Sequence, residues 1–364
     1  MHNKKQILSL QGIRAMMFIL IFFFHSDLFL DRYFVFNRFF IGGGTLAVSV
    51  FFILSGFVTG LSRKHIHCVK EYTSYIKSKI SRFYFFHLFF LILSIPLSYN
   101  FFLHDKKGLV SLILDFLLLQ SWVPDPAVWR SYNGLAWFLS TLLFCYLLLP
   151  FVEYLFGNLL SKLHPKWKIF YLMQIMVFAF FISVLLCFVI KENVEYWLYA
   201  FPPVRLLDFY SGYALAQIYK EYDFEKSNYY GKKYSVLEIL LFVCVVFLML
   251  AYPFIDAGFR RMALYIPFSL SLVYVFAIGN GVLSKILSMR WIVEIGNNTF
   301  FYYIAHQVVF KWMYQLYKRT PFFGENRFFW IDFLLVVLCL MITIIVKKFF
   351  YFVERNCVKS RLQK

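Results

Sequence analysis

Charged residues are scarce in this sequence. Asp, Glu, Lys and Arg make up only 15% of the 364 residues, whereas 61% are hydrophobic and 23% are aromatic. So few charges cannot cover the surface of a water-soluble protein of this length, which excludes a soluble enzyme or binding domain. The chain therefore has to fold in a lipid bilayer, where a spanning helix needs about 20 mostly apolar residues.

Clustered cysteines and several common motifs are also absent. The six cysteines form neither a CxxC motif nor a Cys/His ligand pattern, so we expect no disulfide framework and no metal site. No esterase-type Gly-x-Ser-x-Gly motif occurs. The first apolar run, residues 8–30, is too long for a cleavable signal peptide and lacks a small-residue cleavage site, so it is interpreted as the first span.

Acidic residues are outnumbered by basic ones. The chain has 37 Lys and Arg against 19 Asp and Glu, which gives a formal net charge of +18. Such a balance can indicate nucleic-acid binding, but the basic residues here gather in short loops between apolar runs, as membrane topology requires. We therefore expect contacts with membrane lipids and no nucleic-acid partner.

Apolar runs separated by polar or helix-breaking residues predict ten spans. They lie near residues 8–30, 41–62, 83–103, 135–157, 169–190, 200–219, 235–255, 263–282, 291–317 and 328–352. A further run, 109–122, is short for a span and precedes a loop-forming segment, so we expect it to remain on the outer side, either at the surface or as a re-entrant segment. The predicted fold is an all-α polytopic bundle of about ten transmembrane helices.

The basic residues favour ten spans over eleven. With ten spans and a cytoplasmic N-terminus, roughly twice as many Lys and Arg residues face the cytoplasm as face outward, and this bias is lost if 109–122 also crosses. Both termini and the basic loop 63–82 are therefore predicted to be cytoplasmic. We expect one domain over residues 1–355 and a short basic cytoplasmic tail at 356–364.

Two polar side chains interrupt the first span. Arg14 and His25 are eleven residues apart, a rotation of about 1100° on an α-helix, so both project from nearly one face, about 16 Å apart along the axis. Ionisable residues inside a span are costly and commonly functional. In the alternative interpretation, Arg14 reaches the cytoplasmic surface and His25 lies at the outer interface beside Asp27.

The second span adds a more specific signal. Residues 51–57 read Phe-Phe-Ile-Leu-Ser-Gly-Phe. Together with an Arg, ten residues and a His in the first span, this segment resembles the opening of the acyltransferase 3 family of membrane O-acyltransferases. The Arg-to-His spacing alone is a weak signal, but both features in this order are specific.

Two later segments extend the resemblance. The family's basic Arg-x-x-Arg before the third span corresponds to Lys79 and Arg82, where lysine loses the bidentate fork of arginine. Both residues suit the phosphates of CoA, although a basic cluster there also serves as a topology signal. Trp137 and Ser140 match a Trp-x-Leu-Ser segment. The resemblance implies substrate binding by Trp137, whereas a tryptophan there is otherwise typical of the aromatic belt at the membrane interface. Leu142 stands where many members carry Glu.

Matches continue toward the end of the chain. Arg205 and Gly212 resemble a span with an Arg and a following Gly; Arg205 is a candidate for substrate binding or for local pairing with Asp208. His306 lies in a segment similar to the family's Tyr-x-x-His and is either a packing residue or a secondary catalytic candidate. Asn356 replaces the Pro of a terminal Glu-Arg-Pro. The resemblance thus touches nearly the full length.

The resemblance implies transfer of an acetyl group from cytoplasmic acetyl-CoA, or from another acyl-CoA, to a hydroxyl of a cell-envelope glycan such as O-antigen or exopolysaccharide. The acceptor is expected to be the glycan itself or its lipid-linked form. It implies a bacterial cytoplasmic (inner) membrane, no bound cofactor, and the stand-alone form without an extracytoplasmic hydrolase-like domain. His25 is the candidate general base. Arg14 lies too far from His25 to touch the same atom, so we expect it to anchor the donor. Ser55 is either a substrate-site residue or a small packing residue.

Two other functions fit the composition. A transporter or flippase is also a polytopic bundle with intramembrane charges, and a non-catalytic partner in envelope assembly is a third hypothesis. Transporters usually consist of related halves, but neither the Arg/His span nor the Phe-Phe-Ile-Leu-Ser-Gly-Phe segment recurs in the second half. The acyltransferase hypothesis is therefore preferred.

Overall fold

The computed structural model describes residues 6–30, 34–62, 68–81, 83–221, 231–319 and 329–362, without the side chains of 28, 34–39, 155–161, 329 and 352–362. Every regular element in this part of the chain is helical. The α-helices are α1 (Leu8–Phe24), α2 (Asp27–Leu30), α3 (Phe34–Ser62), α4 (Val69–Ile80), α5 (Tyr84–Ser94), α6 (Tyr99–His104), α7 (Lys106–Phe116), α8 (Pro126–Trp129), α9 (Trp137–Ser161), α10 (Pro165–Val189), α11 (Pro202–Glu221), α12 (Gly231–Ala251), α13 (Ala257–Arg261), α14 (Tyr265–Ile278), α15 (Val282–Leu287), α16 (Arg290–Arg319) and α17 (Phe329–Leu362). Shorter helical turns are η1 (Pro96–Ser98), η2 (Gln120–Trp122), η3 (Glu195–Ala200) and η5 (Tyr252–Phe254).

The predicted all-helical membrane fold is confirmed. Six helical segments of the described chain, in α3, α9, α10, α12, α13 with α14, and α17, are long and apolar enough to cross a bilayer. A bent pair, α5 followed by η1 and α6, makes a seventh candidate. The other three expected spans correspond to α1, α11 and α16, which are shorter or more polar.

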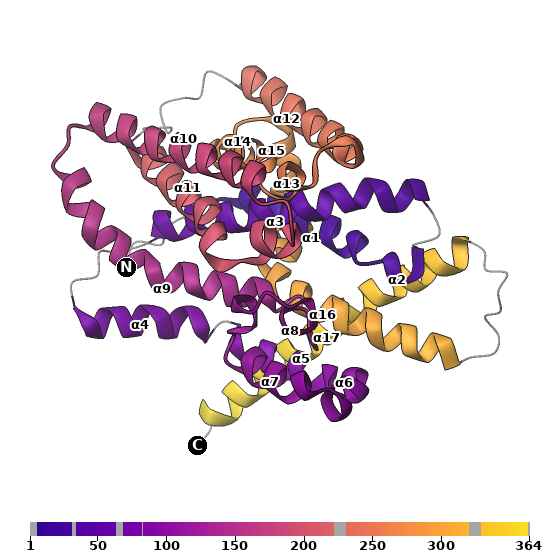
Figure 1. Ribbon diagram of the computed structural model, residues 1–364. Coiled ribbons are helices and arrows are strands. Elements are labelled where there is room, and N and C mark those ends of the chain that lie inside the picture. Colours follow the sequence, from indigo (N-terminus) through magenta and orange to yellow (C-terminus); the bar gives the residue numbers. More distant parts are fainter. Residues whose placement is uncertain are drawn as a thin grey trace.

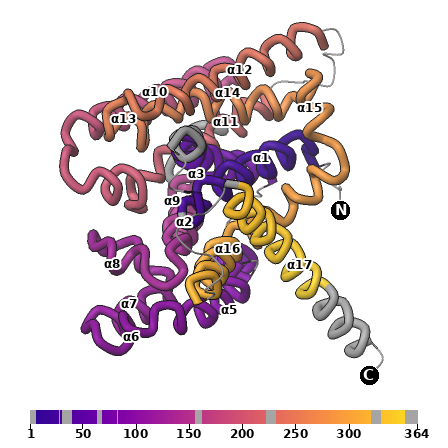
Figure 2. Tube along the Cα trace, turned by 90° about the vertical axis from the view of Figure 1, so that its right-hand side faces the viewer, coloured from indigo at the N-terminus to yellow at the C-terminus, as the bar shows by residue number. Residues whose placement is uncertain are grey.

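Those three helices lie against other helices over much of their surface. α1 packs against α3 and α16, and α11 packs against α3 and α10. Figure 2 shows α1 and α3 between a layer of α10, α12 and α14 and a second group made by α5 to α8, α16 and α17. The same order is visible in Figure 1. A helix enclosed by protein needs less apolar surface than one that faces lipid, which explains the polar residues of α11 and α16.

The third expected span is broken. α5 ends at Ser94, and the chain bends by 45° before η1 and α6. Pro96 lies at the start of η1, and proline lacks the N–H and clashes with the preceding turn, so it accounts for the break.

The doubtful run 109–122 does not form one long helix. It contains most of α7, which has 11 residues and is about 16 Å long, and then η2. α7 packs against α5, α6 and α8. It is too short to cross the bilayer, in agreement with the ten-span prediction. Its re-entrant placement stays a prediction.

The second span and α11 cross in close contact. A Cβ atom on Gly56 of α3 would lie 1.9 Å from the carbonyl oxygen of Phe209, and one on Gly212 of α11 would lie 1.9 Å from that of Ile53. Small residues allow helix backbones to approach this closely in membranes. Gly56 and Gly212, which both lie in segments that resemble the family, therefore have a packing role. Their close contact holds α3 in position against α11.

Candidate functional site

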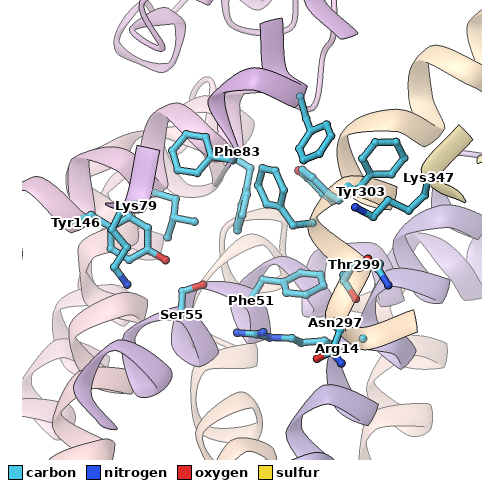
Figure 3. A pocket seen from close by; sticks show the side chains of 17 residues that line it. Arg14, Phe51, Ser55, Lys79, Phe83, Tyr146, Asn297, Thr299, Tyr303 and Lys347 are labelled. Carbon is cyan, nitrogen blue, oxygen red and sulfur yellow. The ribbon is translucent and has the colours of Figure 1, made fainter. Parts of the chain in front are cut away.

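A cavity of about 350 Å³ is lined by α1, α3, α4, α5, α9, α16 and α17. Its walls are largely aromatic, and Figure 3 shows the side chains that surround it. Among the described lining residues, three are cationic, namely Arg14, Lys79 and Lys347, and none is acidic. A partly enclosed cavity with charge of one sign attracts ligands of the opposite sign, so this one suits an anion that also carries apolar groups.

Arg14 reaches the cavity from the middle of α1. Its Nη1 donates a hydrogen bond to Oε1 of Gln11, with a distance of 3.2 Å. On the adjacent wall, α16 approaches α1 so closely that a Cβ atom on Gly296 would lie 2.0 Å from the carbonyl oxygen of Gln11. This crossing brings Asn297 beside Arg14, as Figure 3 shows. The N-terminal part of α16 therefore supplies polar groups next to the arginine.

Lys79 enters the cavity wall from α4, a helix that has no buried residues. Its Nζ donates to Oγ1 of Thr59 at 3.1 Å and lies 4.5 Å from the centroid of the Tyr146 ring. Ser55 lies one turn before Thr59 on α3 and also lines the cavity. Of the residues expected from the sequence, the structure thus gathers Arg14, Lys79 and Ser55 around one space.

Lys347 of α17 is a third cation in the cavity wall, and sequence analysis did not single it out. Its Nζ lies 5.2 Å from the ring centroids of both Phe86 and Phe301. In the sequence it belongs to a basic end of the last span, which is typical of a topology signal. Asn297 was also missed, although an amide within a predicted span was a usable signal.

The two histidines suggested by the sequence lie together. His25 caps the C-terminal end of α1, and His306 lies in the middle of α16 and is fully buried. Their nearest ring nitrogens, Nδ1 of His25 and Nε2 of His306, are 3.2 Å apart. Nδ1 of His25 is also 2.9 Å from the carbonyl oxygen of Ile21, and Nδ1 of His306 is 2.9 Å from that of Tyr302. The rings of Phe18, Phe22 and Phe310 surround His306.

A loop before α9 is tied to α16 on both sides of His306. Asn133 donates to the carbonyl oxygen of Ile304 at 3.1 Å, and Lys311 donates to that of Tyr132 at 2.8 Å. These bonds hold residues 132–133 beside the histidine pair. Groups from α1, α16 and the loop before α9 therefore surround this second part of the site.

Comparison with known proteins identifies the family of the chain. A family model described as an acyltransferase domain matches residues 7–348, which is nearly the whole chain. The chain belongs to the acyltransferase 3 family. It is also similar to acyltransferase MdmB of Streptomyces mycarofaciens, with 32% identity over 110 residues; the match covers 29% of this chain and only 28% of that relative. No solved structure matches the chain.

One tyrosine lies between the two parts of this acyltransferase-family site. Tyr303 lines the cavity, and its ring centroid is 6.1 Å from that of His306. Its hydroxyl donates to the carbonyl oxygen of Leu135 at 3.3 Å, a long distance for an O–H to O bond. Neither histidine lines the cavity. The cavity therefore ends at Tyr303, one aromatic layer away from the histidine pair.

Not every residue matched to the family lies at the cavity. Trp137 is buried and packs against the rings of Trp129 and Tyr199. Arg205 is fully buried, and its Nη1 lies 2.6 Å from Oδ2 of Asp208. Neither residue lines the cavity, and Arg82 lies outside the described residues.

Arg205 is held entirely by neighbouring protein groups. Besides the ion pair with Asp208, its Nε donates to the carbonyl oxygen of Tyr199 at 2.7 Å and its Nη2 to that of Arg261 at 3.0 Å. A buried guanidinium with three such partners ties α11 to η3 and α13. The local pairing considered from the sequence is thus present, and it accounts for Arg205 without a substrate.

Proposed function

We propose that this protein transfers an acyl group, in the simplest case acetyl, from acyl-CoA to a hydroxyl of a cell-envelope glycan. The observation that carries the proposal is the cavity with Arg14, Lys79 and Lys347 in its aromatic walls. CoA combines several phosphates with an adenine ring and a long, mostly uncharged arm. Cations at hydrogen-bonding distance suit the phosphates, and aromatic rings suit the remainder.

The histidine pair supports the proposed proton transfer. Transfer requires a base that removes the proton of the acceptor hydroxyl, and we assign this role to His25, the C-cap residue of α1. The hydroxyl oxygen attacks the thioester carbonyl carbon as His25 takes the proton. The carbon–sulfur bond then breaks, and the imidazolium returns the proton to the leaving thiolate. The products are the acylated glycan and free CoA.

The geometry sets one requirement for this reaction. Arg14 and His25 lie about 16 Å apart along α1, so a donor anchored by phosphates at Arg14 has to extend along the helix to bring its thioester to His25. Tyr303 occupies the end of the cavity on this route. The proposal therefore includes displacement of the Tyr303 side chain when the acyl end of the donor enters.

Mass spectrometry of envelope glycans tests the function. We expect cells that express the protein to carry glycans heavier by one acyl group, and cells that express His25→Gln to lack that addition, because glutamine cannot act as the base. The matched control is His104→Gln, which makes the same change at an exposed histidine at the end of α6 and should leave acylation intact. Glycans of identical mass with and without the protein would overturn the proposal, and full acylation by stably inserted His25→Gln would overturn the role of His25.

A further inference from the structure

We infer that His306 is a positioning residue for His25: it accepts a hydrogen bond from Nδ1–H of His25 and so directs the free lone pair of His25 to Nε2. This inference deepens the proposed function and rests on it. It assigns the two histidines different tasks, although both are imidazoles within one network, the His306 ring buried and the His25 ring partly buried.

The hydrogen-bond partners determine which nitrogens carry protons. A carbonyl oxygen only accepts, so Nδ1 of His306, at 2.9 Å from the carbonyl oxygen of Tyr302, must be a donor. In a neutral ring the lone pair then lies on Nε2 of His306. This atom faces Nδ1 of His25 at 3.2 Å, so the hydrogen between them belongs to His25.

The second contact of His25 leads to the same assignment. Its Nδ1 is 2.9 Å from the carbonyl oxygen of Ile21, which again requires a hydrogen on Nδ1. One N–H is therefore shared between two acceptors. The remaining nitrogen, Nε2 of His25, has the lone pair, and no hydrogen bond to it is found among the described residues. That nitrogen is the one able to take a proton from a hydroxyl.

The same contacts stabilise His25 after it has taken the proton. The imidazolium keeps its Nδ1–H bonds to His306 and Ile21, and bonds from a charged donor are stronger than those from a neutral one. His25 also caps the C-terminal end of α1, where the helix dipole favours positive charge. In the serine hydrolase triad a buried carboxylate orients its histidine in this way. Here a neutral imidazole supplies the acceptor.

Two substitutions separate positioning from the alternatives. His306→Gln can place Oε1 near the position of Nε2 and so retains an acceptor, whereas His306→Phe fills the aromatic surroundings but offers none. We expect His306→Phe to lower kcat by about 10²-fold with unchanged KM for acyl-CoA, because part of the general-base contribution is lost. His306→Gln should retain most of the wild-type kcat. Acyl-CoA binding by each purified variant reports whether the cavity is intact.

Nitrogen NMR of ¹⁵N-histidine-labelled protein gives a readout that does not depend on turnover. The His25 signals are assigned by their absence in His25→Gln, and we expect mainly the Nδ1–H tautomer in the wild type and in His306→Gln. In His306→Phe the carbonyl oxygen of Ile21 is the remaining acceptor, and it already accepts the backbone N–H of His25. We therefore expect a larger fraction of the Nε2–H tautomer in His306→Phe. A wild-type kcat in His306→Phe would show that His306 only packs against its neighbours. A His306→Gln variant as inactive as His25→Gln would show that His306 itself carries a proton. Either result overturns the inference. Absence of acylation by the wild type with the expected tautomers would instead overturn only the proposed function.

Discussion

At the residue scale, the donor cavity combines cations from distant parts of the chain. Arg14 comes from the first helix, Lys79 from the peripheral helix α4, and Lys347 from the last helix. All three face aromatic walls, where water screens a charge less than at the free surface. Under the proposed function, each of them contributes to donor affinity and not to proton transfer.

Replacement of Lys347 tests this division of tasks. We expect Lys347→Ala to raise KM for acyl-CoA by about tenfold, which is the effect of losing one charged contact of about 1.4 kcal/mol, with kcat nearly unchanged. Lys347→Arg should restore most of the affinity. Steady-state kinetics in membranes or nanodiscs measures both constants.

The neighbouring lysine provides the control for that experiment. Lys348 is exposed and does not line the cavity, so Lys348→Ala makes the same charge change without the contact. Equal effects of the two substitutions would show that only the overall charge of this end of α17 matters. In that case Lys347 would not be a donor contact.

The sequence predicted part of this site. Arg14 and His25 were expected because two polar residues share one face of an apolar helix, and α1 carries both. The contact between His25 and His306 joins residues 281 positions apart, and no local pattern reports which distant helix packs on which. Lys347 was not predicted for another reason. A lysine at the end of a span has the same sequence context whether it binds a ligand or only sets the membrane topology.

At the scale of the helix, the crossing of α1 and α16 connects both parts of the site. Gly296 permits the crossing, with Arg14 and Asn297 on one side and the histidine pair farther along. We expect Gly296→Ala to force the helices apart, to destabilise the protein by about 1–3 kcal/mol and to abolish acylation. Thermal unfolding and the acylation assay measure the two effects.

A glycine elsewhere serves as the reference for that substitution. At Gly231, the first residue of α12, an added Cβ atom would meet, among the described residues, only the carbonyl oxygen of Asn280, at 3.8 Å. Gly231→Ala should therefore leave stability and activity near those of the wild type. Full activity in Gly296→Ala would mean that the α1–α16 spacing does not limit the reaction.

The α7–α8 segment depends on an exposed ion pair. Nζ of Lys107 lies 2.6 Å from Oδ2 of Asp125, and Oδ1 of Asp125 accepts from the backbone N–H of Ala127. The lysine first, and the backbone N–H second, lower the pKa of the Asp125 carboxyl below its usual value. A lowered carboxyl pKa stabilises the fold at neutral pH, and this contribution is lost as the pH falls through that pKa.

Asp125→Asn imitates the protonated carboxyl at neutral pH. We expect faster hydrogen exchange of the amides from Ala127 to Arg130, which form α8 and its end, while exchange in α9 stays unchanged. The change should be modest, because solvent screens an exposed pair. Unchanged exchange in α8 would show that the pair and the cap do not hold this segment.

The helices themselves were more predictable than the site. Long apolar runs fixed the positions of nearly all expected spans, since twenty apolar residues in a bilayer have few alternatives to a helix. The bend after α5 was not expected, although Pro96 is a recognisable cause. The burial of α11 and α16 within the bundle could not be predicted, because it follows from contacts between helices.

At the scale of the whole molecule, the orientation in the membrane is the main open prediction. The positive-inside bias places α4 and both termini in the cytoplasm. Cys68, the exposed residue before α4, provides a test in a variant without the other cysteines. We expect a membrane-impermeant maleimide to label Cys68 only in permeabilised or inverted membranes, and to label Lys106→Cys, at the start of α7, in intact ones. The reverse labelling would invert the topology and place the cavity on the outer side.

The cavity wall is built from both ends of the chain, and this has a consequence for biosynthesis. During translation, Arg14 and His25 enter the membrane first, whereas His306 and Lys347 follow only with α16 and α17. A ribosome-bound chain in which α16 and α17 have not yet been inserted still lacks one wall of the cavity and the partner of His25. Under the proposed function, the nascent protein consumes no acyl-CoA during its insertion into the membrane. Catalytic competence begins when the last helix leaves the translocon, so the order of synthesis alone prevents premature turnover.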